Sequence, residues 1–190
     1  MSAPAAAAAR ALRAFTHVVR ADFLERVRRH GFIMTLAVTL WFAYVFLPPN
    51  GSHYSTFQIA DHRGLYGSAW VGAVAALLAS PMLSLAGFFL VKNAIERDRV
   101  TGVGQILATT PLSKPLYTLG KAASNFAVLA AMTALLSLGA VGMQLLRAED
   151  MHIDLVALFA PFVVVTLPAM ALVAGLAVLF ESIRWLRGGL

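Results

Sequence analysis

Four long apolar runs divide the chain, and each is too continuous to be the inward face of a soluble element. They cover residues 31–48, 67–91, 122–146 and 155–180, and none of them contains Asp, Glu, Lys, Arg or His. A helix that crosses a bilayer needs about 20 mostly apolar residues. Only helices and closed barrels satisfy the backbone in lipid, and unbroken apolar runs lack the alternation of a barrel strand. The pattern therefore predicts an all-α, polytopic membrane protein with four transmembrane helices.

The composition agrees with this prediction and narrows the kinds of site. Hydrophobic residues make up 59% of the chain and charged residues only 13%, against about 25% charged residues in soluble domains. There is no cysteine, so disulfides and thiolate metal sites are excluded. The net charge is +6, but the basic residues flank the apolar runs and do not form one face of a soluble module. We therefore expect no nucleic-acid partner.

The lysines and arginines predict the orientation of the spans. Thirteen of the 15 lie before the first span, between the second and third spans, or after the fourth. Only Arg63 and Arg147 lie in the other two connections. Cytoplasmic loops carry the excess of basic residues. Both termini and the loop 92–121 are therefore predicted to be cytoplasmic.

Residues 1–30 form a basic tail before the transmembrane domain, which we place at residues 31–190. Within the tail, residues 10–30 are typical of an amphipathic helix in the membrane interface, with its apolar stripe in lipid and its arginines on phosphates. The alternative is a basic flank that only fixes orientation. The apolar stripe consists of Leu12, Phe15, Val19, Phe23 and Val27, and the polar stripe of Arg10, Arg13, His17 and Arg20.

Small side chains recur every four residues in the second run, at Ser68, Gly72, Ala76, Ser80 and Ser84. Such a ridge lets another helix approach closely in lipid, so we expect it to pack against another span or subunit. The alternative is that small residues are simply common in this alanine-rich chain. Proline inside a helix removes a backbone donor, which predicts kinks at Pro81, Pro161 and Pro168.

The polar residues within the spans are neutral, and we expect Asn125, Gln144 and Thr166 among them to hydrogen-bond between helices. Ion-coupled carriers place carboxylates or histidines inside the membrane, and these runs have none. The chain also lacks the G-x-x-x-x-G-K-[ST] phosphate loop. We expect no catalytic residue, cofactor or metal, and a permease would need a separate ATPase.

The loop 92–121 is the richest segment. Charged residues at Glu96, Arg97, Asp98 and Arg99 follow the second run, and Gly102 and Gly104 then break the helix. Residues 105–109 could form a short helical turn before Pro111. Pro115 suits the first turn of the next helix. An exposed short helix between two spans is a suitable docking element for a partner, whereas the simpler alternative is a solvated loop.

This segment resembles the first cytoplasmic loop of type 2 ABC transporter (ABC-2) permeases, in which a coupling helix sits on the ATP-binding subunit. The resemblance is carried by the charged residues, then Thr-Gly, then Ile-Leu-Ala-Thr-Thr-Pro-Leu-Ser over residues 106–113. It implies a permease subunit that exports an unidentified substrate across a bacterial cytoplasmic membrane, with an ATP-binding subunit, a second permease unit and membrane lipids as partners. By resemblance, the residues that couple to the ATPase within loop 92–116 are Glu96, Arg97, Asp98, Arg99, Gly102, Thr110, Pro111 and Ser113. Permeases of this family usually carry six spans, so this chain would correspond to the N-terminal portion or to a split subunit.

Two other functions stay open. A membrane enzyme could use the polar residues of the outer connections, where histidines and aspartates could bind a metal; more often such groups are solvated. These residues are His53, Asp61, His62, Arg63, Asp150, His152 and Asp154. A non-transporting membrane scaffold is the other alternative.

Overall fold

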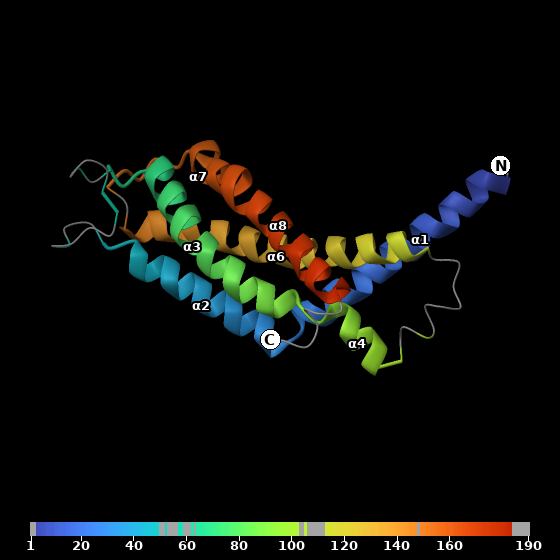
Figure 1. The fold of residues 1–190 in the computed structure, drawn as a ribbon. Coiled ribbons are helices and arrows are strands. Elements are labelled where there is room, and N and C mark those ends of the chain that lie inside the picture. The colour runs from blue at the N-terminus through green and yellow to red at the C-terminus, as the bar shows by residue number, and fades with distance from the viewer. Residues whose placement is uncertain are drawn as a thin grey trace.

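The computed structural model describes residues 3–49, 52, 57–58, 62, 64–102, 105, 113–147 and 149–183, with the side chains of residues 3–11 and 46 left out. Over these residues the chain is helical and contains no strand. The elements in chain order are α1 (Ala3–Val27), α2 (His30–Phe46), α3 (Ser68–Val91), α4 (Ala94–Val100), α6 (Lys114–Arg147), α7 (Leu155–Pro161), the π-helical turn η1 (Phe162–Thr166) and α8 (Leu167–Ser182). Their arrangement is an elongated bundle (Figure 1).

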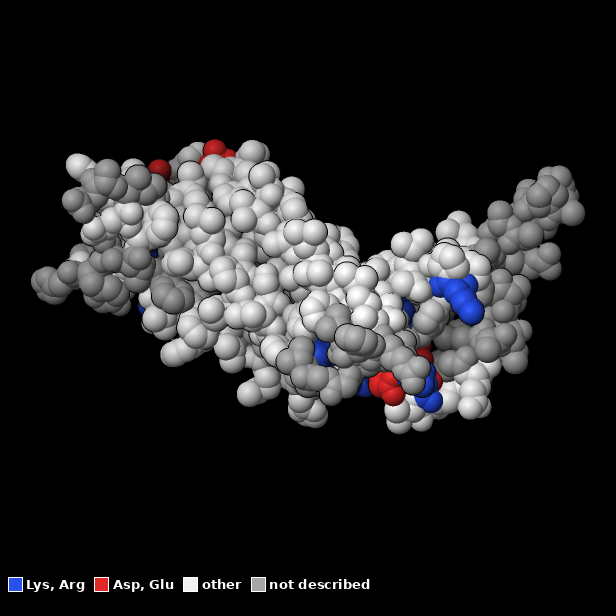
Figure 2. All heavy atoms as spheres, viewed as in Figure 1, with Lys and Arg blue, Asp and Glu red and all other residues white. Residues whose placement is uncertain are grey.

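The bundle has two distinct ends. At one end, which we call the loop end, α2 and α6 finish and α3 and α7 begin. At the other, the junction end, α3 and α8 finish, α2 begins, α1 lies against α6, and α4 lies against α8 (Figure 1). On the face seen in Figure 2, charged side chains gather toward the two ends, and the body between them shows few charges. This division is typical of a protein whose middle lies in lipid.

Among the described residues, three helical segments are long and apolar enough to cross a membrane: Ser68–Val100, Lys114–Arg147 and Leu155–Ser182. They contain the predicted spans 122–146 and 155–180 and all of 67–91 except Gly67, which caps the first of them. The first predicted span, residues 31–48, corresponds to α2, which has only 17 residues. At 1.5 Å per residue, this helix is about 25 Å long, somewhat less than the roughly 30 Å of a hydrocarbon core. The structure thus establishes an all-helical chain with three helices of spanning length.

The helix of the third predicted span, α6, starts earlier than its apolar run predicts. α6 begins at Lys114, with Pro115 in its first turn as expected, and has 34 residues. It is therefore about 51 Å long, which exceeds the membrane core by roughly 20 Å. α1 packs along the additional length: the ring of Phe15 and the side chain of Val18 lie against Gly120.

The ridge of small residues on α3 faces other helices. Gly72, Ala76 and Ser80 are buried and Ser84 is half-buried. A Cβ atom added at Gly72 would come within 2.9 Å of the Cα of Leu158, so α3 and α7 are in backbone contact there. About two turns beyond Ser80 along α3, a Cβ at Gly87 would lie 2.6 Å from Leu129 of α6. Small side chains thus bring α3 close to two neighbours.

A widened turn follows Pro161. The five residues Phe162–Thr166 form a π-helical turn, and the helix then continues as α8 with Pro168 in its first turn. Such turns accommodate residues whose normal helical hydrogen bonds are disturbed. The Ser80 and Thr166 hydroxyl oxygens are 2.8 Å apart, which joins this turn to α3.

Candidate functional site: a charged junction of four helices

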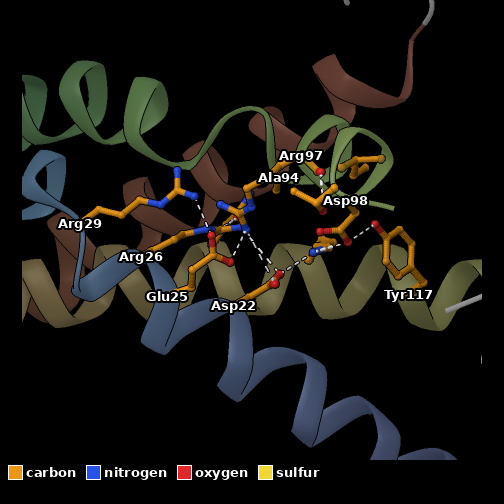
Figure 3. A network of polar contacts seen from close by, with 12 residues as sticks. Asp22, Glu25, Arg26, Arg29, Ala94, Arg97, Asp98 and Tyr117 are labelled. Atoms are coloured by element: carbon orange, nitrogen blue, oxygen red, sulfur yellow. Dashed lines mark hydrogen bonds and ion pairs between the residues drawn. The ribbon is translucent and has the colours of Figure 1, made fainter. Parts of the chain in front are cut away.

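Lys121 lies at the centre of a buried network of charges at the junction end. Its side chain is only 1% exposed, and its Nζ lies 2.7 Å from Oδ2 of Asp22 on α1 and 2.6 Å from Oδ2 of Asp98 on α4. Tyr117, one turn earlier on α6, donates a 2.7 Å hydrogen bond to Oδ2 of Asp98. Figure 3 shows Asp22, Asp98 and Tyr117 pointing toward one another from α1, α4 and α6. Lys121 therefore holds α1 and α4 to α6.

A second pair of side chains repeats the contact one turn along. Arg26 follows Asp22 by four residues on α1, and Asn125 follows Lys121 by four on α6, so each pair lies on one helical face. Arg26 donates a hydrogen bond to Oδ1 of Asn125, and both residues are buried. Burial lowers the pKa of the Arg26 guanidinium from its ordinary value, while the nearby Asp22 carboxylate raises it. The α1–α6 contact is thus polar at its centre.

The short helix α4 has two opposite faces. Its inner face carries Asp98 and Arg97, whose Nη2 lies 3.3 Å from Glu25 and 3.8 Å from Asp22. Its outer face carries Glu96 and Arg99, which pair with each other at 3.0 Å and are about half exposed. Val100 is 80% exposed beside them. The four charged residues that the sequence places together are therefore divided between the junction and the surface.

Glu181, near the end of α8, holds the start of α4. Its carboxylate accepts hydrogen bonds from the backbone N–H groups of Ala94 at 2.9 Å and Ile95 at 2.5 Å. Carboxylates at a helix N-terminus satisfy free N–H groups and interact favourably with the helix dipole. Asn93, the residue directly before α4, has φ 68° and separates α4 from α3. α4 is therefore fixed to α8 by main-chain hydrogen bonds and to α1 and α6 by ion pairs.

The remaining residues predicted to couple to an ATPase lie further along the loop. Gly102 has φ +76° after the end of α4 and Ser113 is exposed before α6. Thr110 and Pro111 lie outside the described residues, as does most of the short turn expected at 105–109. The described short helix of this loop is instead α4, directly after the second long apolar run.

Among the residues assigned to an interfacial helix, Arg13 and Arg20 are exposed and the side chain of Arg10 is outside the described set. Phe15 lies against Gly120, and Phe23 packs beside the buried cluster that contains Phe32 and Val91. Part of the apolar stripe of α1 therefore contacts other helices. Its place in a membrane interface stays a prediction.

The neutral polar residues of the spans do link helices, as expected. Asn125 contacts α1, Thr166 contacts α3, and Gln144 of α6 donates a 3.0 Å hydrogen bond to the His152 carbonyl and a 2.8 Å bond to the Ser68 hydroxyl.

The alternative metal site at the loop end gains no support. Asp150 accepts a hydrogen bond from the N–H of His152 at 2.8 Å, and Asp154 caps α7 by accepting one from Ala157 at 3.0 Å. Over the described part of the chain, no three His, Asp or Glu side chains come together as metal ligands would. His53, Asp61 and Arg63 lie outside that part. The Asp150 and Asp154 carboxylates thus accept hydrogen bonds from backbone N–H groups.

In the sequence, Lys121 stands out only as a basic residue that sets orientation, and no local pattern connects Asp22, Arg26 or Glu181 with the middle loop. One signal was available. Asp22 and Arg26 are four residues apart, as are Lys121 and Asn125, and each pair lies beside an apolar stripe. No family model, no curated protein and no solved structure matches this chain. The contacts within the junction therefore carry the functional argument.

Proposed function

We propose that this chain is the transmembrane subunit of an ATP-driven transporter of the ABC-2 type, without catalytic activity of its own. In this proposal it crosses a bacterial cytoplasmic membrane four times with both termini inside, α2 being the short first span. It pairs with a second permease unit and exports a substrate whose chemistry the spans do not identify. A separate ATP-binding subunit docks on the segment 92–116.

The observation that carries the proposal is the two-sided arrangement of α4. One side presents Glu96, Arg99 and Val100 outward, while Arg97 and Asp98 reach the junction on the other. A partner that moves the outer side of α4 would pull on α1, α6 and α8 together, since buried ion pairs resist separation. Three apolar helices of spanning length and the basic residues around the junction end support the membrane setting.

The test is co-expression with the ATP-binding subunit encoded nearest to this chain, followed by purification and an ATP hydrolysis assay. We expect a stoichiometric complex with hydrolysis faster than that of the ATPase alone. The variant Glu96→Lys/Arg99→Glu should weaken association by at least about tenfold, because exchanged charges meet like charges across the interface. Arg97 is unsuitable for this purpose, as it also holds the junction together.

The matched control is Arg20→Glu, a charge reversal at an exposed position of α1. It should leave association within about twofold of the wild type. Wild-type affinity in the Glu96/Arg99 variant would overturn the docking role of α4. A complex without any stimulated hydrolysis would favour the non-transporting scaffold.

A further inference from the structure

A basic cavity lies where α3 meets α4, next to the start of α2. It has a volume of about 500 Å³ and is lined by cationic side chains at Arg29, Lys92 and Arg97, by Glu96, and by the apolar Phe89 and Leu90. Gly31 of α2 faces Leu90 closely, since a Cβ there would lie 3.4 Å from the Leu90 side chain. The cavity therefore opens between the beginning of α2 and the last turn of α3.

The charges around this cavity do not cancel. Arg29 and Arg97 share the carboxylate of Glu25, at 2.6 Å and 3.3 Å, and Glu96 is paired with Arg99. Lys92 has no carboxylate partner among the described residues, and its Nζ lies 4.7 Å from the centre of the Phe89 ring. Lys92 is therefore available to an anion. Arg29 and Arg97 share the single negative charge of Glu25, so part of their positive charge is available as well.

The apolar side of the cavity indicates what kind of anion fits. Phe89 is 57% exposed. It belongs to the last turn of α3, an apolar helix that ends at Val91, directly before Lys92. The end of such a helix lies at the level of lipid headgroups. An occupant must therefore place a phosphate against Lys92 and Arg29 and a hydrocarbon chain along Phe89 and Leu90. Basic pockets between helices at a membrane surface bind anionic lipid headgroups in this manner.

We propose that this cavity binds one anionic glycerophospholipid, with its phosphate on Lys92 and Arg29. The proposal requires a chain embedded in a membrane but no ATPase, so it stands or falls separately from the transport function.

The experiment is native mass spectrometry of the purified full chain in detergent, titrated with phosphatidylglycerol or with phosphatidylcholine of the same acyl chains. Each cation near an anionic lipid contributes roughly a fivefold gain in affinity. We expect a preference for phosphatidylglycerol, about fivefold weaker binding of it in Lys92→Gln, and about 25-fold weaker binding in Arg29→Gln/Lys92→Gln. Binding of phosphatidylcholine should not change.

The matched control is Arg28→Gln, which removes an exposed charge next to Arg29 that does not line the cavity. It should bind phosphatidylglycerol as the wild type does. Equal binding of both lipids by the wild type, or unchanged binding in the double variant, would overturn the proposal. Displacement of the lipid by inorganic phosphate at cellular concentration would also overturn it, since a lipid held by its chain as well should resist such competition.

Discussion

The two ends of the bundle hold their helices together by different means. At the junction end, buried charges from α1, α4 and α6 meet around Lys121, and Glu181 of α8 caps α4. At the loop end, the buried side chains that meet are neutral, since Ser68 and Gln144 bond to each other and to the backbone near His152. Gly72 brings α3 against α7 there, and the partly buried Arg147 and Glu149 bond to backbone groups. The buried polar side chains of the loop end, Ser68 and Gln144, are neutral, and neutral groups cost less free energy to bury than charged ones.

Hydrogen bonding differs between the ends in the same way. At the junction end, Nη2 of Arg26, Nδ2 of Asn125 and the hydroxyl of Ser124 are buried and make no hydrogen bond. Buried polar networks that are only partly satisfied are less stable than neutral, well-packed contacts. The loop end is therefore suited to a permanent contact, whereas the junction end keeps buried polar groups without a hydrogen-bond partner, which offsets part of the stabilisation from its ion pairs.

The largest effect should follow from Lys121→Met, which leaves Asp98 buried without its cation and Asp22 with only the two arginines 3.8 Å away. We expect a loss of about 3–5 kcal/mol in the free energy of unfolding, the usual result when one partner of a buried ion pair is removed. Unfolding by SDS in mixed micelles measures it. The triple variant Lys121→Met/Asp22→Asn/Asp98→Asn removes the charges together and should recover most of the loss. A loss below about 1 kcal/mol in the single variant would contradict the buried position of Lys121.

A smaller effect should follow from Gly72→Ala at the loop end. The added Cβ overlaps the backbone of Leu158, so α3 and α7 must separate, at about 1–3 kcal/mol of unfolding free energy. Gly175→Ala on α8 is the control because its Cβ would meet no atom within 4 Å. That variant should stay within about 0.5 kcal/mol of the wild type. Equal losses in both variants would argue against the close α3–α7 contact.

The smallest effect should follow from Gln144→Leu. It removes neutral hydrogen bonds to Ser68 and His152, each worth about 1 kcal/mol, and leaves no charge unpaired. Asn125→Leu, its counterpart at the junction end, leaves the Arg26 guanidinium without its acceptor and should lose about 2–3 kcal/mol. The same unfolding assay compares them. A larger loss for Gln144→Leu would reverse the contrast between the two ends.

Much of the helical layout was predictable from local sequence. The apolar runs at 67–91, 122–146 and 155–180 lie within three long helices, and Pro115 and Gly102 mark a helix start and a helix end as expected. These features depend on residues close together in the chain, because hydrophobicity, proline and glycine act locally. α6 begins at Lys114, before its apolar run, where Pro115 marks the start and α1 packs against the polar first turns.

The amino-acid sequence by itself determined that the chain is helical and largely apolar, with its charges outside the long runs. Only the tertiary structure decided that Lys121 pairs with Asp22, 99 residues earlier, and that Glu181 caps a helix 87 residues before it. Hydropathy assigns every charge to a surface or a membrane edge, since an isolated buried charge is unfavourable. Whether a charge can be buried depends on an opposite charge brought beside it by folding, and that information is absent from any local pattern.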